Sequence, residues 1–154
     1  MPEFFDLSLL VEKSKENKQS LDKLLYKSLG LNEGDSTNNL HAFFNNPQIL
    51  LSFFQHEDTD YDEIFVSLGD QTFHRTDFEN ELRPLTNFVE YCFNNCASIK
   101  FGLCSYELNA YVLRDVKFLS EINRSILEKF PIVFERSLMG RIELTLNPLA
   151  QQLW

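Results

Sequence analysis

The first part of the chain alternates between apolar and polar positions and then changes to a helical period. Apolar residues occupy every second position from Phe5 to Val11, which predicts a strand. Over 20–31 the leucines recur three and four positions apart, which predicts an amphipathic helix. Ser20 is placed to cap the N-terminus of this helix, and Gly30 is placed to end it.

The middle of the chain predicts a buried helix followed by a strand. Asn46 and Pro47 form a typical helix start, so we expect a short helix over 47–55. It is apolar on nearly all sides, which indicates burial. Residues 63–73 have the alternation of a strand, with a turn near Gly69.

A continuous apolar stripe predicts a longer helix. Thr76 and Glu79 have the spacing of a capping box at its start, and Pro84 is expected to kink the helix or divide it in two. The stripe consists of residues three or four positions apart: Phe78, Leu82, Leu85, Val89, Cys92 and Cys96.

The last third predicts a strand or two over 98–113, a helix over 116–130, and a strand pair at 132–137 and 141–146. We therefore expect one globular domain, 1–154, of the α+β class: a single-layer mixed, mostly antiparallel sheet packed on one face against three to four helices. A doubly wound fold is disfavoured, because no glycine-rich phosphate loop follows a strand.

Composition indicates a folded protein of a reducing compartment. Of its 154 residues 44% are hydrophobic, which suffices for a core without disulfide bonds. Cys92, Cys96 and Cys104 are an odd number and are expected to pack in the core. No signal peptide is expected, because an acid precedes the first short apolar run, and no apolar stretch is long enough to span a bilayer. We expect a cytoplasmic location.

The negative charge is concentrated in one segment. The net charge is −9, and residues 57–82 contain nine acids against one base, Arg75, a local charge of −8. Such a field repels nucleic acid and anionic membranes and favours cationic partners. We therefore expect a basic protein partner, with no nucleic acid or membrane bound.

The densest part of this segment is QHEDTDYDEIF, residues 55–65. Asp58, Asp60 and Asp62 match the start of a helix–loop–helix calcium site, but its sixth position is Glu63 instead of glycine and its twelfth is Gly69 instead of glutamate. Catalytic carboxylates need one buried and one ionised group, which an exposed run does not predict. A solvated acidic connector remains an alternative.

Other constellations for chemistry are weak. Cys92 and Cys96 have an admissible zinc spacing, but both fall on the apolar stripe and no paired histidine completes the ligand set. His74 lies near Asp77 in the sequence, but no nucleophile motif accompanies them. An enzyme that uses His74 therefore ranks third, after the two binding roles described next. We expect no metal, no cofactor and no catalytic residue.

The chain resembles the immunity proteins of bacterial contact-dependent inhibition and polymorphic-toxin systems. The shared features are small size, an acidic segment, here centred on Tyr61, and the lack of catalytic motifs. The resemblance is of class and charge, and it implies an acidic domain that covers the basic active site of a nuclease toxin. The alternative is a regulatory or small-ligand-binding module, or an assembly subunit. The expected partner-binding residues are Glu57, Asp58, Asp60, Tyr61, Asp62, Glu63, Asp70 and Asp77.

Overall fold

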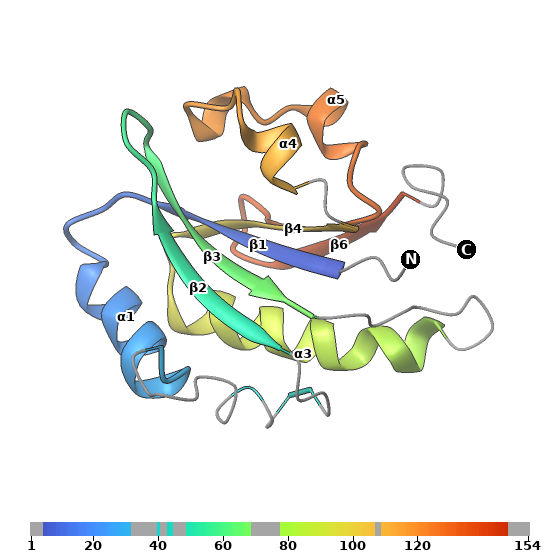
Figure 1. Cartoon of the computed structure of the whole chain (residues 1–154), viewed down its shortest axis with the longest axis horizontal. Helices are drawn as coiled ribbons and strands as arrows, with labels where there is room; N and C mark the ends of the chain where they lie inside the picture. Colours follow the sequence, from blue (N-terminus) through green and yellow to red (C-terminus); the bar gives the residue numbers. More distant parts are fainter. Residues whose placement is uncertain are drawn as a thin grey trace.

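The computed structural model describes residues 5–31, 40, 43–44, 49–68, 78–106 and 109–147. Six strands form one antiparallel sheet in the order β2-β3-β1-β4-β5-β6, with helices on both of its faces (Figure 1). The α+β class is therefore confirmed. The strands are β1 (Phe5–Glu12), β2 (Leu50–Gln55), β3 (Tyr61–Ser67), β4 (Ile99–Tyr106), β5 (Ile132–Arg136) and β6 (Ile142–Leu146). The helical segments are α1 (Lys18–Asp22), the π-helix η1 (Lys23–Ser28), α3 (Phe78–Asn95), α4 (Asn109–Leu113), the 3₁₀ helix η3 (Leu119–Glu121) and α5 (Arg124–Leu127).

Strand β1 lies in the interior of the sheet, between β3 and β4. Leu9 pairs with Ile64 on one side and with Gly102 on the other. All but the last residue of β1 are buried, including the polar Asp6 and Ser8. The alternation that predicts this strand therefore separates two covered faces, one apolar and one partly polar, and not a core face from a solvent face.

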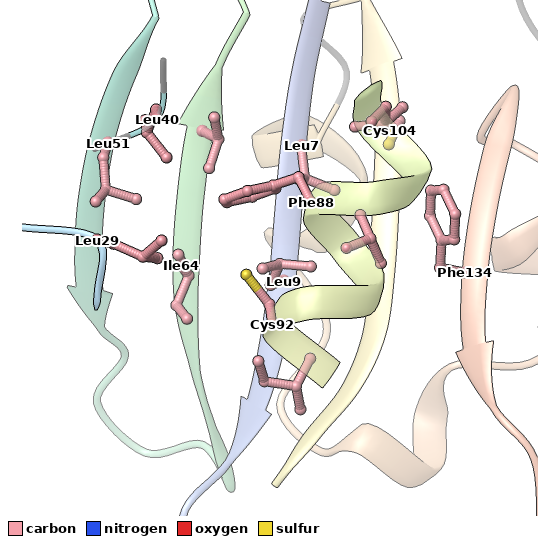
Figure 2. Packing of buried hydrophobic residues seen from close by; sticks show 14 of the residues in the cluster. Leu7, Leu9, Leu29, Leu40, Leu51, Ile64, Phe88, Cys92, Cys104 and Phe134 are labelled. Atoms are coloured by element: carbon pink, nitrogen blue, oxygen red, sulfur yellow. The ribbon is translucent and has the colours of Figure 1, made fainter. Parts of the chain in front are cut away.

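Helix α3 covers the apolar face of the sheet. In Figure 2, Phe88 and Cys92 of α3 lie over Leu7 and Leu9 of β1. The apolar stripe is confirmed for its described members, which are all buried: Leu82, Leu85, Val89, Cys92 and Cys96. Pro84 does not divide the helix, since it sits in the second turn, where its missing N–H removes one hydrogen bond near the start.

The three cysteines are free thiols buried in this core. Burial raises the pKa of Cys92 well above its ordinary value, and neighbouring Cys96 raises it further. Burial likewise raises the pKa of Cys104. The thiolate forms of Cys92 and Cys104 are therefore disfavoured, which makes these two thiols poor nucleophiles.

A second core lies on the opposite face, beneath α4, η3 and α5 (Figure 1). The expectation that helices cover only one face is therefore wrong. Leu10, Leu103 and Val133 project to this face, and burying them requires a second layer. The helical side contributes mainly the following buried residues: Leu113, Val116, Ile122, Leu127 and Phe130.

The helix predicted over 47–55 is wrong: residues 50–55 form β2, which pairs with β3. A short apolar run cannot distinguish a buried helix from a strand. Here Leu51 and Phe53 face the α3 core, while Leu50 and Phe54 remain exposed on the other face. Asn46 and Pro47 lie outside the described residues.

Two further predictions need correction after residue 106. β4 is one strand that ends at Tyr106, opposite Phe5 at the start of β1. The last part of the predicted strand range, Asn109–Leu113, forms the helix α4 instead. The helix predicted over 116–130 is reduced to η3 and α5. Asn123 interrupts it, because its backbone is extended and its side chain accepts a hydrogen bond from Ile126 N at 3.1 Å, as an N-cap does.

The first helix and the last strand pair agree better with the sequence. The helix begins at Lys18 and not at Ser20, and it widens into the π-helix η1, where Leu29 N donates to Leu24 O at 2.8 Å. Gly30, with φ of 70°, ends it as predicted. Strands β5 and β6 pair as expected.

Gly102 of β4 lies at a close approach between neighbouring strands. A Cβ there would lie 3.2 Å from Leu9 Cδ2 and 3.3 Å from Phe134 Cβ. Gly102→Val should therefore destabilise the protein by about 1–3 kcal/mol through overpacking, measured by urea unfolding. Thr145→Val on the edge strand β6 is the control and should change stability by less than about 0.5 kcal/mol. Equal effects of the two substitutions would contradict this tight packing.

Candidate functional site

The acidic stretch forms the β2–β3 hairpin. The turn occupies 56–60, with Asp58 in the left-handed region at φ of 57°. Tyr61, Asp62 and Glu63 are the first residues of β3, which begins two positions before the predicted strand start at Glu63. The stretch is thus half turn and half strand, so alternate residues of it point to opposite faces of the sheet.

The structure places the predicted site residues in different environments. Glu57 and Asp58 are exposed, and Asp60 and Asp62 are half-buried. Tyr61 is 1% exposed and Glu63 is 7% exposed, so both lie inside the protein. The remaining two predicted residues, Asp70 and Asp77, and also His74, lie outside the described residues. The partner-binding role of the group stays a prediction.

Asp60 fixes the hairpin to the segment before η3. Its carboxylate accepts a hydrogen bond from Leu119 N at 2.8 Å, and its backbone N donates to Lys117 O at 3.2 Å. On the other side, its carbonyl accepts from Lys13 N at 2.9 Å. The turn is therefore held from both flanks.

Lys13 also holds the second half-buried acid. Its ammonium lies 3.8 Å from Asp62 Oδ1 and donates a hydrogen bond to His56 O. The same Asp62 oxygen accepts from His56 N at 3.3 Å. Asp62 therefore closes the hairpin locally and is not a free surface charge.

Tyr61 anchors the hairpin to the second core. Its hydroxyl donates to Val116 O at 2.8 Å, and its ring lies 5.2 Å from the His56 ring, centroid to centroid. Burial raises the pKa of Tyr61 to about 12, and the nearby charges of Glu63 and Asp60 contribute to the rise. The neutral phenol is therefore strongly favoured.

Glu63 belongs to a buried polar network beneath α4. Its Oε2 accepts a hydrogen bond from Ser8 Oγ at 2.6 Å, and Ser8 Oγ accepts one from Asn109 Nδ2 at 2.8 Å. Asn109 Nδ2 also donates to Leu103 O at 2.9 Å, and its Oδ1 accepts from the Ser105 hydroxyl. Every buried side-chain nitrogen and oxygen atom of the described residues has a partner.

Strand register brings this network together. Ser8 pairs with Phe65, two residues from Glu63, so the Ser8 and Glu63 side chains are diagonal neighbours on one face. Asn109 reaches them because it opens α4 directly above β1 and β4. The sequence pattern does not single out Ser8 or Asn109 as site residues. The one indication for Ser8 is that it and Asp6 are polar within an otherwise apolar stretch of β1.

His56 completes the arrangement at the surface. Its Nε2 lies 2.9 Å from Glu63 Oε1, and its side chain is 34% exposed. Glu63 thus joins a buried serine to a half-exposed imidazole. Carboxylates that contact histidine in this way fix its ring orientation and tautomer.

A pocket of about 420 Å³ opens beside this pair, within the size range of small-molecule sites. Its least exposed lining residues, Tyr61, Glu63, Leu113 and Val116, form the inner wall. Phe54 and Phe65 form an aromatic side wall, with ring centroids 5.9 Å apart. The other lining residues are His56, Glu57, Thr59, Ala110, Arg114 and Lys117.

The lining combines polar and apolar groups. It offers a fixed carboxylate acceptor among aromatic and aliphatic walls. The Ser8 hydroxyl that contacts Glu63 is fully buried and does not line the pocket. Within the described ranges, no group of three or more His, Cys, Asp or Glu residues could hold a metal ion.

Comparison of the chain with protein-family models, with curated proteins and with solved structures finds no match. None of the helices in the described part of the chain is both long and apolar enough to cross a membrane.

Tyr61→Phe should change how stability depends on pH. An unfolded tyrosine ionises near pH 10.0, whereas folded Tyr61 ionises near 12, so raising the pH between these values favours unfolding of the wild type. The variant lacks this contribution, and its denaturation midpoint should fall less from pH 10 to 11.5. Tyr111→Phe, at an exposed position of α4, should keep the wild-type fall. An unchanged pH dependence in Tyr61→Phe would refute the assignment.

Ser8→Ala should destabilise the protein by about 1–3 kcal/mol, because it removes a donor from Glu63 and an acceptor from Asn109 in a buried site. The matched control is Ser52→Ala. Ser52 and Ser8 both pair with Phe65, so they share a row of the same face, but Ser52 is only half-buried. Urea denaturation measures both variants, and similar small losses would show that the network contributes little.

Proposed function

We propose that this protein is a small acidic cytoplasmic binding protein that neutralises a basic partner, most concretely an immunity protein that blocks a nuclease-type toxin. The charge distribution supports it: residues 57–82 carry −8 of the net −9. Carboxylates spaced along this segment imitate the phosphates of nucleic acid. They attract the cationic active site of a nuclease and accelerate association.

The tip of the β2–β3 hairpin is the observation that carries this proposal. Glu57 and Asp58 are exposed, and neither side chain has a hydrogen bond or ion pair with another described residue. The carboxylates of Asp60 and Asp62, by contrast, are used within the protein. Glu57 and Asp58 are therefore the acids of this stretch whose carboxylates face solvent without a bond to another described residue.

The attachment of the hairpin tip to neighbouring segments favours binding of a partner. Asp60 and Tyr61 tie the turn to residues 116–119, and Lys13 ties it to the end of β1. A hairpin held in this way loses little conformational freedom when a partner binds, which lowers the entropic cost of association. The half-buried acids behind the tip add to its negative field without needing direct contacts.

A second candidate function is binding of a small ligand, and the pocket beside His56 and Glu63 favours it. Its volume of about 420 Å³ and its mixture of aromatic walls with one deep polar group are typical of ligand sites. Thermal-shift screening of small metabolites would separate this role from protein binding.

The double variant Glu57→Arg/Asp58→Asn should slow association with a basic toxin domain encoded immediately upstream. We expect the association rate to fall by about tenfold or more at 50 mM salt, with a smaller difference at 500 mM, because screening removes long-range attraction. Surface plasmon resonance measures both rates.

The control variant Glu90→Arg/Glu128→Gln changes the net charge by the same amount at exposed positions elsewhere, on α3 and after α5. It should slow association less. Equal rates for the hairpin variant and the wild type at low salt would exclude the hairpin tip as the contact surface. An upstream gene with no basic toxin domain would count against the immunity role itself.

A further inference from the structure

We infer that the pocket at the base of the β2–β3 hairpin receives a lysine or arginine side chain of the basic partner, with its cationic head against Glu63. This rests on the proposed function, since the occupant belongs to a basic protein. It adds the residue type that anchors the complex and a pocket that adjoins the exposed hairpin tip and shares Glu57 with it.

The walls of the pocket suit the stem of such a side chain. The Phe54 and Phe65 rings pack against each other on one side, tilted at an interplanar angle of 52°. Leu113 and Val116 supply aliphatic surface on the inner wall, from α4 and the segment after it. Long basic side chains bury their methylene groups against such surfaces, and aromatic faces attract the cationic head.

The inner wall supplies the negative charge. Glu63 cannot turn away from the pocket readily, because each carboxylate oxygen already has one partner, Ser8 on Oε2 and His56 on Oε1. A carboxylate has about four acceptor positions, so it can still accept from a bound cation.

A cation is favoured over a neutral group. Ser8 is neutral, and His56 offsets the charge of Glu63 only when it is protonated. A buried carboxylate without full compensation is costly, and an ammonium or guanidinium ion supplies the missing charge together with strong hydrogen bonds.

The mouth of the pocket leaves room for this occupant. Arg114 lines it, but its guanidinium lies 3.8 Å from Asp115 and 5.3 Å from the Tyr111 ring centroid, neither of which lines the pocket. Lys117 is exposed, and Glu57 carries the opposite charge on the same rim. Because Glu57 belongs to both the tip and the mouth, one partner surface can contact both.

The test uses protein NMR with N-acetyl-lysine methylamide and N-acetyl-arginine methylamide as probes, and N-acetyl-norleucine methylamide as the uncharged control. Either cationic probe should shift the aromatic resonances of Phe54, Tyr61 and Phe65 in a saturable way. Its affinity should be at least about tenfold higher than that of the norleucine probe, a difference expected of one charged contact. Absence of saturable shifts at these rings, or equal affinity for the norleucine probe, would overturn the inference; the latter would indicate an apolar ligand.

Two variants locate the contact. Glu63→Gln keeps the side-chain shape and one acceptor oxygen but removes the charge, so it should weaken binding of the cationic probes by about tenfold. Ala110→Trp fills the rim from the exposed side of α4 and should abolish binding while Glu63 stays in place. Ala97→Trp, at an exposed position outside the pocket, is its matched control and should bind normally.

The ¹H–¹⁵N spectrum establishes that each variant is folded, so a folding defect in Glu63→Gln leaves Ala110→Trp as the deciding measurement. Full binding by Ala110→Trp would overturn the inference. This outcome is separable from failure of the proposed function: if the probes do not bind but the hairpin-tip variant still slows toxin association, only the pocket assignment is lost.

Discussion

Burial of the Glu63 carboxylate constrains the arrangement of three elements. A buried anion must be met by donors, and here they come from Ser8 on β1 and His56 at the end of β2. Ser8 in turn requires Asn109, which places the first residue of α4 over the sheet. One side chain therefore links the hairpin, a sheet-interior strand and the helical layer above them, and residues of β2, β3 and α4 line the pocket beside it.

Much of the fold follows from local sequence pattern, and the failures have physical causes. Alternation suffices for β1 and β6, because apolar residues recur at every second position of each. It fails over 50–55, because Leu50 and Phe54 are apolar but face outward, and only the pairing with β3 decides between helix and strand. It fails after Val116, where Asn123 stops a periodic segment from forming one helix.

The candidate site is harder to predict than the fold. The sequence identifies the acidic stretch as a group, but burial divides it, and burial depends on register between distant strands. Nothing local indicates that Glu63 meets Ser8 while Glu57, six positions earlier, faces solvent. The role of Asn109 is equally hard to predict from the sequence, because it depends on the crossing of α4 over the sheet.

The hairpin joins two kinds of position within a few residues. Asp60, Tyr61 and Glu63 each hold a neighbouring element, so exchanging them disturbs the fold. Glu57 and Asp58 hold none among the described residues. Over evolutionary time, the tip can therefore diversify while the frame beneath it stays constant. Related chains that share this frame could differ in the surfaces they recognise through a few changes at the turn alone.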